Sequence, residues 1–301
     1  MAEAHIKAFS DIPQVELAGI YSRSYEKSIS LSQKYKITNA YESISEMYEH
    51  TYADLVVIAV SELSTYSVCC QAFQFPWKLL VEKPVGCDLQ EALDLVNLSL
   101  RYNSGAYVGL NRRHYSSTRA VLDEVSLSDE PRLVQVFDQE NPLVALHNGT
   151  PSKVVENFMF ANSIHIVDYL KIFCRGDVLK VNHLIRWSPS NPRFVLATIE
   201  YSSGDIGLYQ ATWNGPGPWA VSVTTQSKRW EMRPLEQAFT QVYQSRKSEP
   251  LPVHNWDLQF KPGLRQQALE VINLLSGKSH SLPTIVESFD TMKLISQIYE
   301  A

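Results

Sequence analysis

Apolar and polar positions follow two different patterns along the chain, and the change falls near residue 113. Before it, short apolar runs are separated by helix-like segments. The run at 54–60, DLVVIAV, is nearly all apolar, as expected of a strand that is covered on both faces. The pattern predicts further strands at 15–21, 79–81 and 106–110, and helices at 24–35 and 89–100. Strands that alternate with helices in this way predict a parallel sheet with right-handed crossovers.

After about residue 130 the pattern changes to long stretches in which apolar and polar residues alternate, interrupted by one strong helix at about 161–174. The stretches are VLKVNHLIRW, RFVLATIEYSSG, DIGLYQATW, WAVSVTTQ and RWEMRPL. The sequences around Ser203–Gly204 and Ser227–Lys228 are typical of hairpin turns. Two helices, at 263–276 and 284–300, close the chain. This half is predicted to be an α+β domain with an open antiparallel sheet.

The length of 301 residues fits two domains of ordinary size. We predict a Rossmann-like domain at 1–113 and a domain for substrate binding and oligomerisation at 114–301. Hydrophobic residues make up 45% of the chain and charged residues 20%, which is enough apolar material for a full core.

Charge and hydropathy exclude several classes of function. The formal net charge is −5 and no long basic run is present, which argues against nucleic acid and anionic membrane surfaces as partners. No apolar stretch approaches the roughly 20 residues of a membrane helix, and the N-terminus has no signal-peptide pattern. The four cysteines show no metal-binding spacing. We therefore expect a cytoplasmic protein with reduced thiols and no metal site.

Polar clusters follow four of the predicted strands directly. Because the carboxyl ends of parallel strands meet at one edge of a sheet, these clusters should converge on a ligand site. The clusters are Ser22-Arg23-Ser24, Ser61-Glu62, Glu82-Lys83-Pro84 and Asn111-Arg112-Arg113.

Two of these clusters, together with a histidine in a later helix, resemble the pattern of a known family. The sequence Glu82-Lys83-Pro84 after a buried strand, the sequence Asn111-Arg112-Arg113 after the next, and a histidine in the helix ANSIHIVDYL (161–170) occur in this order. This combination resembles the Gfo/Idh/MocA family of nicotinamide-dependent oxidoreductases, and the similarity extends over the whole chain. The resemblance implies a lysine beside the nicotinamide and the reacting carbon of a sugar or cyclitol. It also implies that the second domain carries the substrate site and packs oligomers.

The resemblance assigns expected roles to individual residues. Lys83 and His165 are expected to handle the proton, because oxidation of an alcohol needs a proton acceptor while the hydride leaves. A positioned amine with a lowered pKa can serve. The residues expected at the cofactor are Ser22, Arg23, Ser61, Glu82, Lys83, Pro84, Asn111 and Arg112, and those expected at the substrate are Tyr115, Asn162, His165 and Asp168.

The chain departs from the family pattern at its start, where the GxGxxG turn is missing. Its opening, MAEAHIKAF, has the pattern of the helix that should follow that turn. We expect the first strand and its glycines to lie upstream of Met1 in a longer ancestral sequence. Such a strand would sit between 15–21 and 54–60, and its loss would leave backbone groups of both neighbours unpaired. The chain is then either the product of a truncated gene model or a damaged Rossmann domain.

A second departure affects the helix that carries His165. The family's acidic position, four residues before the histidine, is occupied here by Ala161. Asn162 can hydrogen-bond a substrate hydroxyl but cannot accept its proton, and Asp168 shares the same broad helix face. Two functions stay open. Lys83 and Asn111-Arg112-Arg113 favour an enzyme, whereas Ala161 and the missing turn favour a decayed family member that acts as a binding or structural protein.

The residues after the first strand bear on the cofactor. Ser22 occupies the position where NAD-binding members place an acidic residue, and Arg23 follows it. A hydroxyl and a guanidinium suit a 2′-phosphate, so we predict NADP, with NAD as the alternative. The expected substrate is a sugar, nucleotide sugar or cyclitol. Since the stretches between 178 and 235 are apolar on both faces, we also predict a homo-oligomer, a dimer or tetramer, through this sheet.

Overall fold

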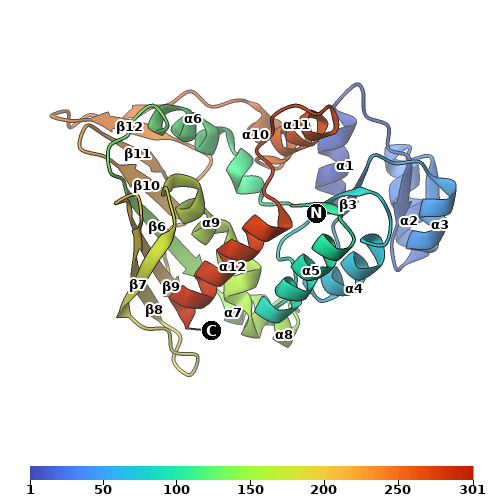
Figure 1. Cartoon of the computed structure of the whole chain (residues 1–301), viewed down its shortest axis with the longest axis horizontal. Helices are drawn as coiled ribbons and strands as arrows, with labels where there is room; N and C mark the ends of the chain where they lie inside the picture. Colours follow the sequence, from blue (N-terminus) through green and yellow to red (C-terminus); the bar gives the residue numbers. More distant parts are fainter. Residues whose placement is uncertain (301) are drawn as a thin grey trace.

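The structure is a computed structural model that describes residues 1–300 (Figure 1). Its first part contains five short parallel strands, each followed or preceded by a helix. The strands are β1 (Gly19–Tyr21), β2 (Asn39–Tyr41), β3 (Leu55–Ile58), β4 (Lys78–Val81) and β5 (Gly105–Val108). The helices are α1 (Ala2–Ser10), α2 (Tyr25–Tyr35), α3 (Ile44–His50), α4 (Glu62–Ala72) and α5 (Leu89–Arg101).

The parallel sheet is divided into two pieces. Strands β1 and β2 pair only with each other, and β3, β4 and β5 form a separate sheet in that order. The division falls between β1 and β3, where the sequence predicts a missing strand. The strand predicted at 15–21 is formed over Gly19–Tyr21. Val56 and Val57 of β3 are only half-buried, although their sequence is typical of a strand covered on both faces.

The second part is built on one eight-stranded sheet. Its strands are β6 (Leu133–Glu140), β7 (Val178–Ile185), β8 (Phe194–Tyr201), β9 (Ile206–Trp213), β10 (Ala220–Thr224), β11 (Lys228–Met232), β12 (Phe239–Val242) and β13 (Glu249–Pro250). Their order is β13-β12-β11-β10-β6-β9-β8-β7, and every pair is antiparallel except β6 and β9. The sheet is therefore mixed rather than purely antiparallel, because the chain between β6 and β9 is long enough to return β9 in the same direction as β6.

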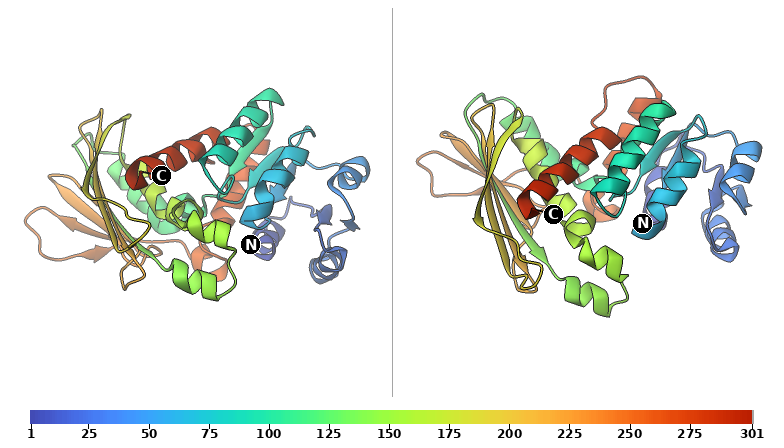
Figure 2. Two further views of the ribbon diagram at one scale, coloured as in Figure 1. Left: turned by 90° about the horizontal axis from the view of Figure 1, so that it is seen from below. Right: turned by 60° about the horizontal axis from the view of Figure 1, so that its bottom comes forward.

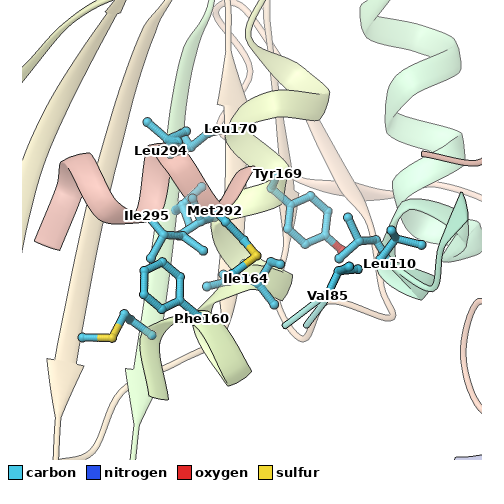
Figure 3. Packing of buried hydrophobic residues seen from close by; sticks show 14 of the residues in the cluster. Val85, Leu110, Phe160, Ile164, Tyr169, Leu170, Met292, Leu294 and Ile295 are labelled. Atoms are coloured by element: carbon cyan, nitrogen blue, oxygen red, sulfur yellow. The ribbon is translucent and has the colours of Figure 1, made fainter. Parts of the chain in front are cut away.

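Helices cover only one face of this large sheet. The helices α9 (Ile164–Phe173) and α12 (Ile285–Tyr299) pack on the inner face, as Figures 1 and 2 show. In the core between them, side chains from α9 and α12 meet Val85 and Leu110, which follow β4 and β5 (Figure 3). The same apolar cluster thus fixes α9 against the ends of the parallel strands.

The remaining helices join the two parts. They are α6 (Ser116–Val125), α7 (Pro142–His147), α8 (Ser152–Glu156), α10 (Trp256–Gln259) and α11 (Leu264–Leu275), with a 3₁₀ turn at Asn111–His114 and a π-turn at Met159–Ser163. Helix α11 packs on α1 and α12 packs on α5, so the end of the chain returns to the first part. The division at residue 113 stays a prediction. Within residues 1–300, no helix has the length and apolar character needed to cross a lipid bilayer.

Candidate active site

Three of the four predicted polar clusters lie along one edge of the three-stranded parallel sheet. The last residues of β3, β4 and β5 are aligned, with Ile58 beside Val81 and Val81 beside Val108. The pairing continues for one more step, because the backbone N–H of Glu82 donates to the carbonyl of Ile58 at 2.8 Å. Ser61, Glu82-Lys83-Pro84 and Asn111-Arg112 therefore leave the sheet on the same side. Ser22 and Arg23 follow β1, which belongs to the other sheet.

Lys83 is the residue that connects this edge to the second part of the chain. Its Nζ donates a hydrogen bond of 2.6 Å to the backbone carbonyl of Ala161, in the π-turn that leads into α9. Burial lowers the pKa of the Lys83 amine from its usual value. The nearby Glu82 opposes this shift, but burial is the larger effect. An amine with a lowered pKa can give up and take back a proton more readily than a solvated lysine.

His165 lies one turn further along, in the first turn of α9. Burial lowers the pKa of its imidazole well below the usual range, and the positive charges of Arg112, Lys83 and Lys261 lower it further. His165 is therefore neutral at physiological pH, and its buried Nδ1 has no hydrogen-bond partner within the protein.

A buried carboxyl group, absent from the sequence-based site, lies beside the same turn. Glu140 at the end of β6 is fully buried, and its Oε2 accepts a hydrogen bond of 2.8 Å from Asn162 Nδ2. Ser163 Oγ donates to Glu140 Oε1 at 3.1 Å. Burial, together with the neighbouring carboxyl of Asp138, raises the pKa of Glu140 well above its usual value. Both oxygens of Glu140 are thus held by the two residues that follow Ala161.

The strand pattern contains the signal that could have identified Glu140. Positions 134, 136, 138 and 140 of β6 all face the core, and the last two are Asp138 and Glu140. Two acids at inward positions of an amphipathic strand are rare in a structural core, because buried carboxyls need partners. Asp138 has one such partner, since the hydroxyl of Tyr209 donates to it at 2.6 Å.

A cavity of about 390 Å³ lies next to these residues. Asn162 and Trp219 line it, together with residues of α7 and Gln139. The guanidinium of Arg112 stacks on the ring of Trp219, with 4.0 Å between its Cζ and the ring centroid. The indole N–H of Trp219 donates to the backbone carbonyl of Gln139 at 2.9 Å, which fixes the ring. The cavity has the size of a small-molecule site.

Several other predicted site residues are held in contacts that order the framework. The carboxylate of Asp168 accepts two hydrogen bonds from Arg113, at 2.6 and 2.7 Å, and one from Thr291 at 3.0 Å. Both of its oxygens are therefore occupied within the protein. This setting differs from the one predicted, and a role of Asp168 in substrate binding stays a prediction.

Asn111 and Tyr115 lie against the start of α11. Asn111 Nδ2 donates to the carbonyl of Pro262 at 2.9 Å. At Gly263, which has a φ of +78°, an added Cβ would come within 2.1 Å of the Asn111 carbonyl oxygen and 2.9 Å of the Tyr115 ring. Only glycine fits this approach, so the strand-end segment and α11 are fixed to each other. Tyr115 is buried beside Arg112.

The described residues fit a dinucleotide at some positions. Helix α1 begins at Ala2 without a side-chain cap, so its first backbone N–H groups are available to an anion. His5 of α1 contacts the Glu82 carboxylate at 2.5 Å, which holds this helix beside the end of β4. Ser22 and the exposed Arg23 follow β1, and Ser61 is exposed at the start of α4. Lys83 and Pro84 follow β4 at the end of this edge that faces α9. The sequence contains no GxGxxG turn.

The comparison with known families agrees with this geometry. Residues 1–110 match the family model described as an oxidoreductase family with an NAD-binding Rossmann fold. These residues belong to the Gfo/Idh/MocA family. The resemblance expected from Glu82-Lys83-Pro84 and Asn111-Arg112-Arg113 is thereby confirmed. None of the curated proteins matches the chain.

Solved structures share the Gfo/Idh/MocA fold over nearly the whole chain. UDP-N-acetylglucosamine 3-dehydrogenase from Acidithiobacillus ferrooxidans is 14% identical, with a TM-score of 0.77 and coverage of 99% of this chain and 92% of its own. An oxidoreductase from Agrobacterium radiobacter, in complex with NAD⁺, L-tartaric acid and magnesium, is 15% identical, with a TM-score of 0.77 and the same coverage. A 3-ketoreductase from Actinomadura kijaniata, in complex with NADP and TDP-benzene, is 13% identical, with a TM-score of 0.74 and coverage of 98% and 92%.

These likenesses establish the architecture of a Gfo/Idh/MocA protein: a Rossmann-like parallel part followed by a part with a large sheet. The fold class predicted from the sequence is confirmed. The family is one of oxidoreductases with an NAD-binding Rossmann fold, and the similar solved structures include both an NAD⁺ and an NADP complex.

Proposed function

We propose that the chain exchanges a hydride between NADP(H) and a hydroxyl or keto group of a sugar, nucleotide sugar or cyclitol. The observation that carries the proposal is the position of Lys83. Its amine leaves the end of β4 and meets the turn before His165, and Asn162 of that turn lines a cavity large enough for a monosaccharide. The names of the similar structures, which include a dehydrogenase of UDP-N-acetylglucosamine and a 3-ketoreductase, agree with this substrate class.

Lys83, His165 and Asn162 each have a distinct role in the proposed reaction. Lys83 accepts the hydroxyl proton when the alcohol is oxidised and returns it when the carbonyl is reduced, which its lowered pKa favours. His165 is neutral and binds the same hydroxyl or its neighbour through a ring nitrogen. Because the Asn162 amide donates to Glu140, its Oδ1 is left to accept a substrate hydroxyl.

For the cofactor, we propose NADP in preference to NAD. When bound, the dinucleotide supplies or accepts the hydride. Arg23 is exposed after β1, and its guanidinium suits a 2′-phosphate. The free N-terminus of α1 would hold the pyrophosphate. Ser61, Glu82, Pro84 and Asn111 stand along the same edge, and Arg112, which the sequence also predicts at the cofactor, stacks on Trp219 beside the cavity.

A non-catalytic role is the second candidate, and two observations favour it. The acidic position before His165 is Ala161, and the parallel sheet is divided between β1 and β3. A protein of this kind would bind a sugar or dinucleotide without turning it over. The Lys83 amine, which meets the same turn through the carbonyl of Ala161, favours the enzyme instead.

The outer face of the large sheet supports a homo-oligomer. Leu133, Leu179, Phe194 and Ile206 lie on strands of this sheet with 40%, 67%, 54% and 37% of their surface exposed. Apolar side chains in one uncovered face are typical of an interface between subunits. We propose a dimer or tetramer through this face. The four cysteines are free thiols, which suits our proposal of a cytoplasmic location.

The test is a screen that separates the two candidates. Sugars, nucleotide sugars and cyclitols are mixed with the protein and NADPH, NADP⁺, NADH or NAD⁺, and the absorbance of the reduced nicotinamide is followed. An enzyme should change this absorbance with at least one substrate, and faster with the phosphorylated cofactor. Calorimetric binding of a substrate and cofactor without any absorbance change would favour the non-catalytic candidate.

A further inference from the structure

Arg112 carries a charge that no acidic group of the protein compensates. Its Nη1 is buried without a hydrogen-bond partner, and no carboxylate within residues 1–300 lies at ion-pairing distance from its guanidinium. Its close contacts are the uncharged Tyr115 and the ring of Trp219, which lines the cavity beside Asn162. A buried guanidinium nitrogen without an acceptor is costly, and an anionic ligand at this place would supply the acceptor.

Another positive group lies near the same place. Lys261, like Arg112, is near enough for its positive charge to lower the pKa of His165. Arg112 therefore has a second basic side chain in its neighbourhood.

Four carboxyl groups in this neighbourhood, those of Glu82, Glu140, Asp168 and Asp257, already have partners within the protein. Burial and the carboxyl of Asp138 raise the pKa of Glu140 well above its usual value. Glu82 contacts His5, and Asp168 accepts hydrogen bonds from Arg113 and Thr291. Asp257 accepts hydrogen bonds from Ser116 and from the backbone N–H of Gly263. Glu140 accepts hydrogen bonds from Asn162 and Ser163.

We propose that the substrate carries an anionic group, a carboxylate or a phosphate, and that Arg112, stacked on Trp219, binds it. The planar guanidinium presents paired N–H donors to a carboxylate or phosphate, and stacking on the indole keeps the fork in one orientation. The inference rests on the proposed function and narrows its substrate class. Uronic acids, sugar acids and nucleotide sugars belong to that class, whereas neutral sugars and plain cyclitols do not.

The test compares ligands that differ in charge. Binding of D-glucuronate, UDP and neutral D-glucose is measured by calorimetry with the unmodified protein and with Arg112→Met. We expect at least one anion to bind at least about tenfold more tightly than D-glucose, and Arg112→Met to abolish the difference. Arg101→Met is the matched control, because Arg101 is an exposed arginine that also lies over an aromatic ring, that of Tyr102, at 5.9 Å. It should bind all three ligands as the unmodified protein does.

Salt and cofactor competition distinguish a substrate site at Arg112 from a cofactor site. If Arg112→Met fails to fold, the salt dependence of the unmodified protein decides, since anion binding should weaken with added salt while D-glucose binding should not. If saturating NADPH displaces the anions, Arg112 serves a cofactor phosphate and the proposal is wrong. It is also wrong if neither anion binds more tightly than D-glucose. Hydride exchange is measured separately, through the absorbance of the nicotinamide. If the protein turns over a neutral sugar, and Arg112→Met does so at the same rate, the proposed anionic substrate is refuted while the oxidoreductase function stands.

Discussion

The buried pair of Arg113 and Asp168 gives a prediction that separates a structural role from a role in substrate binding. The two side chains lie 55 positions apart and are joined by hydrogen bonds of 2.6 and 2.7 Å, with 16% and 3% of their surface exposed. They link the segment after β5 to α9. Asp168→Asn keeps the shape of the side chain but removes its charge, which leaves the guanidinium buried without a counter-ion.

The expected loss follows from this burial. Breaking a buried ion pair from one side typically costs about 3–5 kcal/mol of the free energy of unfolding, because the remaining charge is uncompensated. Asp290→Asn provides the matched control. Asp290 pairs with Lys293 at 2.6 Å on the surface of α12, where the two side chains are 36% and 51% exposed. Such exposed pairs contribute about 0–1 kcal/mol.

Urea unfolding followed by tryptophan fluorescence measures both variants against the unmodified protein. We expect a large drop in the unfolding midpoint for Asp168→Asn and almost none for Asp290→Asn. The structural role is refuted if Asp168→Asn unfolds within about 1 kcal/mol of the unmodified protein. A selective rise in KM at unchanged stability would instead identify Asp168 as a substrate ligand.

Three further predictions concern the proton, the buried acid and the sheet face. Lys83→Met should lower turnover by about 10²–10⁴-fold while thermal stability is kept. The unmodified enzyme should oxidise its substrate faster as pH rises through the lowered pKa of Lys83. A loss of turnover below about threefold in Lys83→Met, or a flat pH profile of the unmodified enzyme, would contradict the role of Lys83. Because the folded state retains the proton of Glu140 and the unfolded state loses it at the usual carboxyl pKa, the free energy of unfolding should fall as pH rises from that value toward the raised one. Glu140→Gln should flatten this fall in urea titrations at a series of pH values, and an unchanged slope would show that Glu140 is ionised. Light scattering should find an oligomer that Phe194→Lys dissociates, whereas a monomer at micromolar concentration would exclude assembly through the outer sheet face.

Local sequence patterns predict much of the fold, because the physics they report is local. Leu79, Leu80 and Val81 are apolar on both faces of a strand, and all three are buried. Asp88 caps α5, with its Oδ1 accepting the Glu91 N–H at 2.9 Å, and Thr284 with Glu287 forms a capping box at the start of α12. Such signals need only neighbouring residues.

Pairings over long distances in sequence could not be predicted in the same way. The parallel register of β6 and β9 depends on the path of the 65 residues between Glu140 and Ile206, not on the composition of either strand. The contact of Glu140 with Asn162 and that of Arg113 with Asp168 likewise depend on how α9 packs against the sheet and the strand ends. Lys83 could be placed, because a strand end is visible in the sequence, but its partner Ala161 could not.

The most direct test of the central claim is transfer of deuterium from the nicotinamide to a sugar. The protein is incubated with NADPH or NADH deuterated at the transferring position and with a mixture of keto sugars and nucleotide-linked keto sugars, and the products are examined by mass spectrometry. We predict one deuterium in at least one product, delivered mainly from NADPH and nearly absent with Lys83→Met. If no product carries deuterium, or if Lys83→Met transfers it as well as the unmodified protein, the assignment of Lys83 to a hydride-exchange site is wrong.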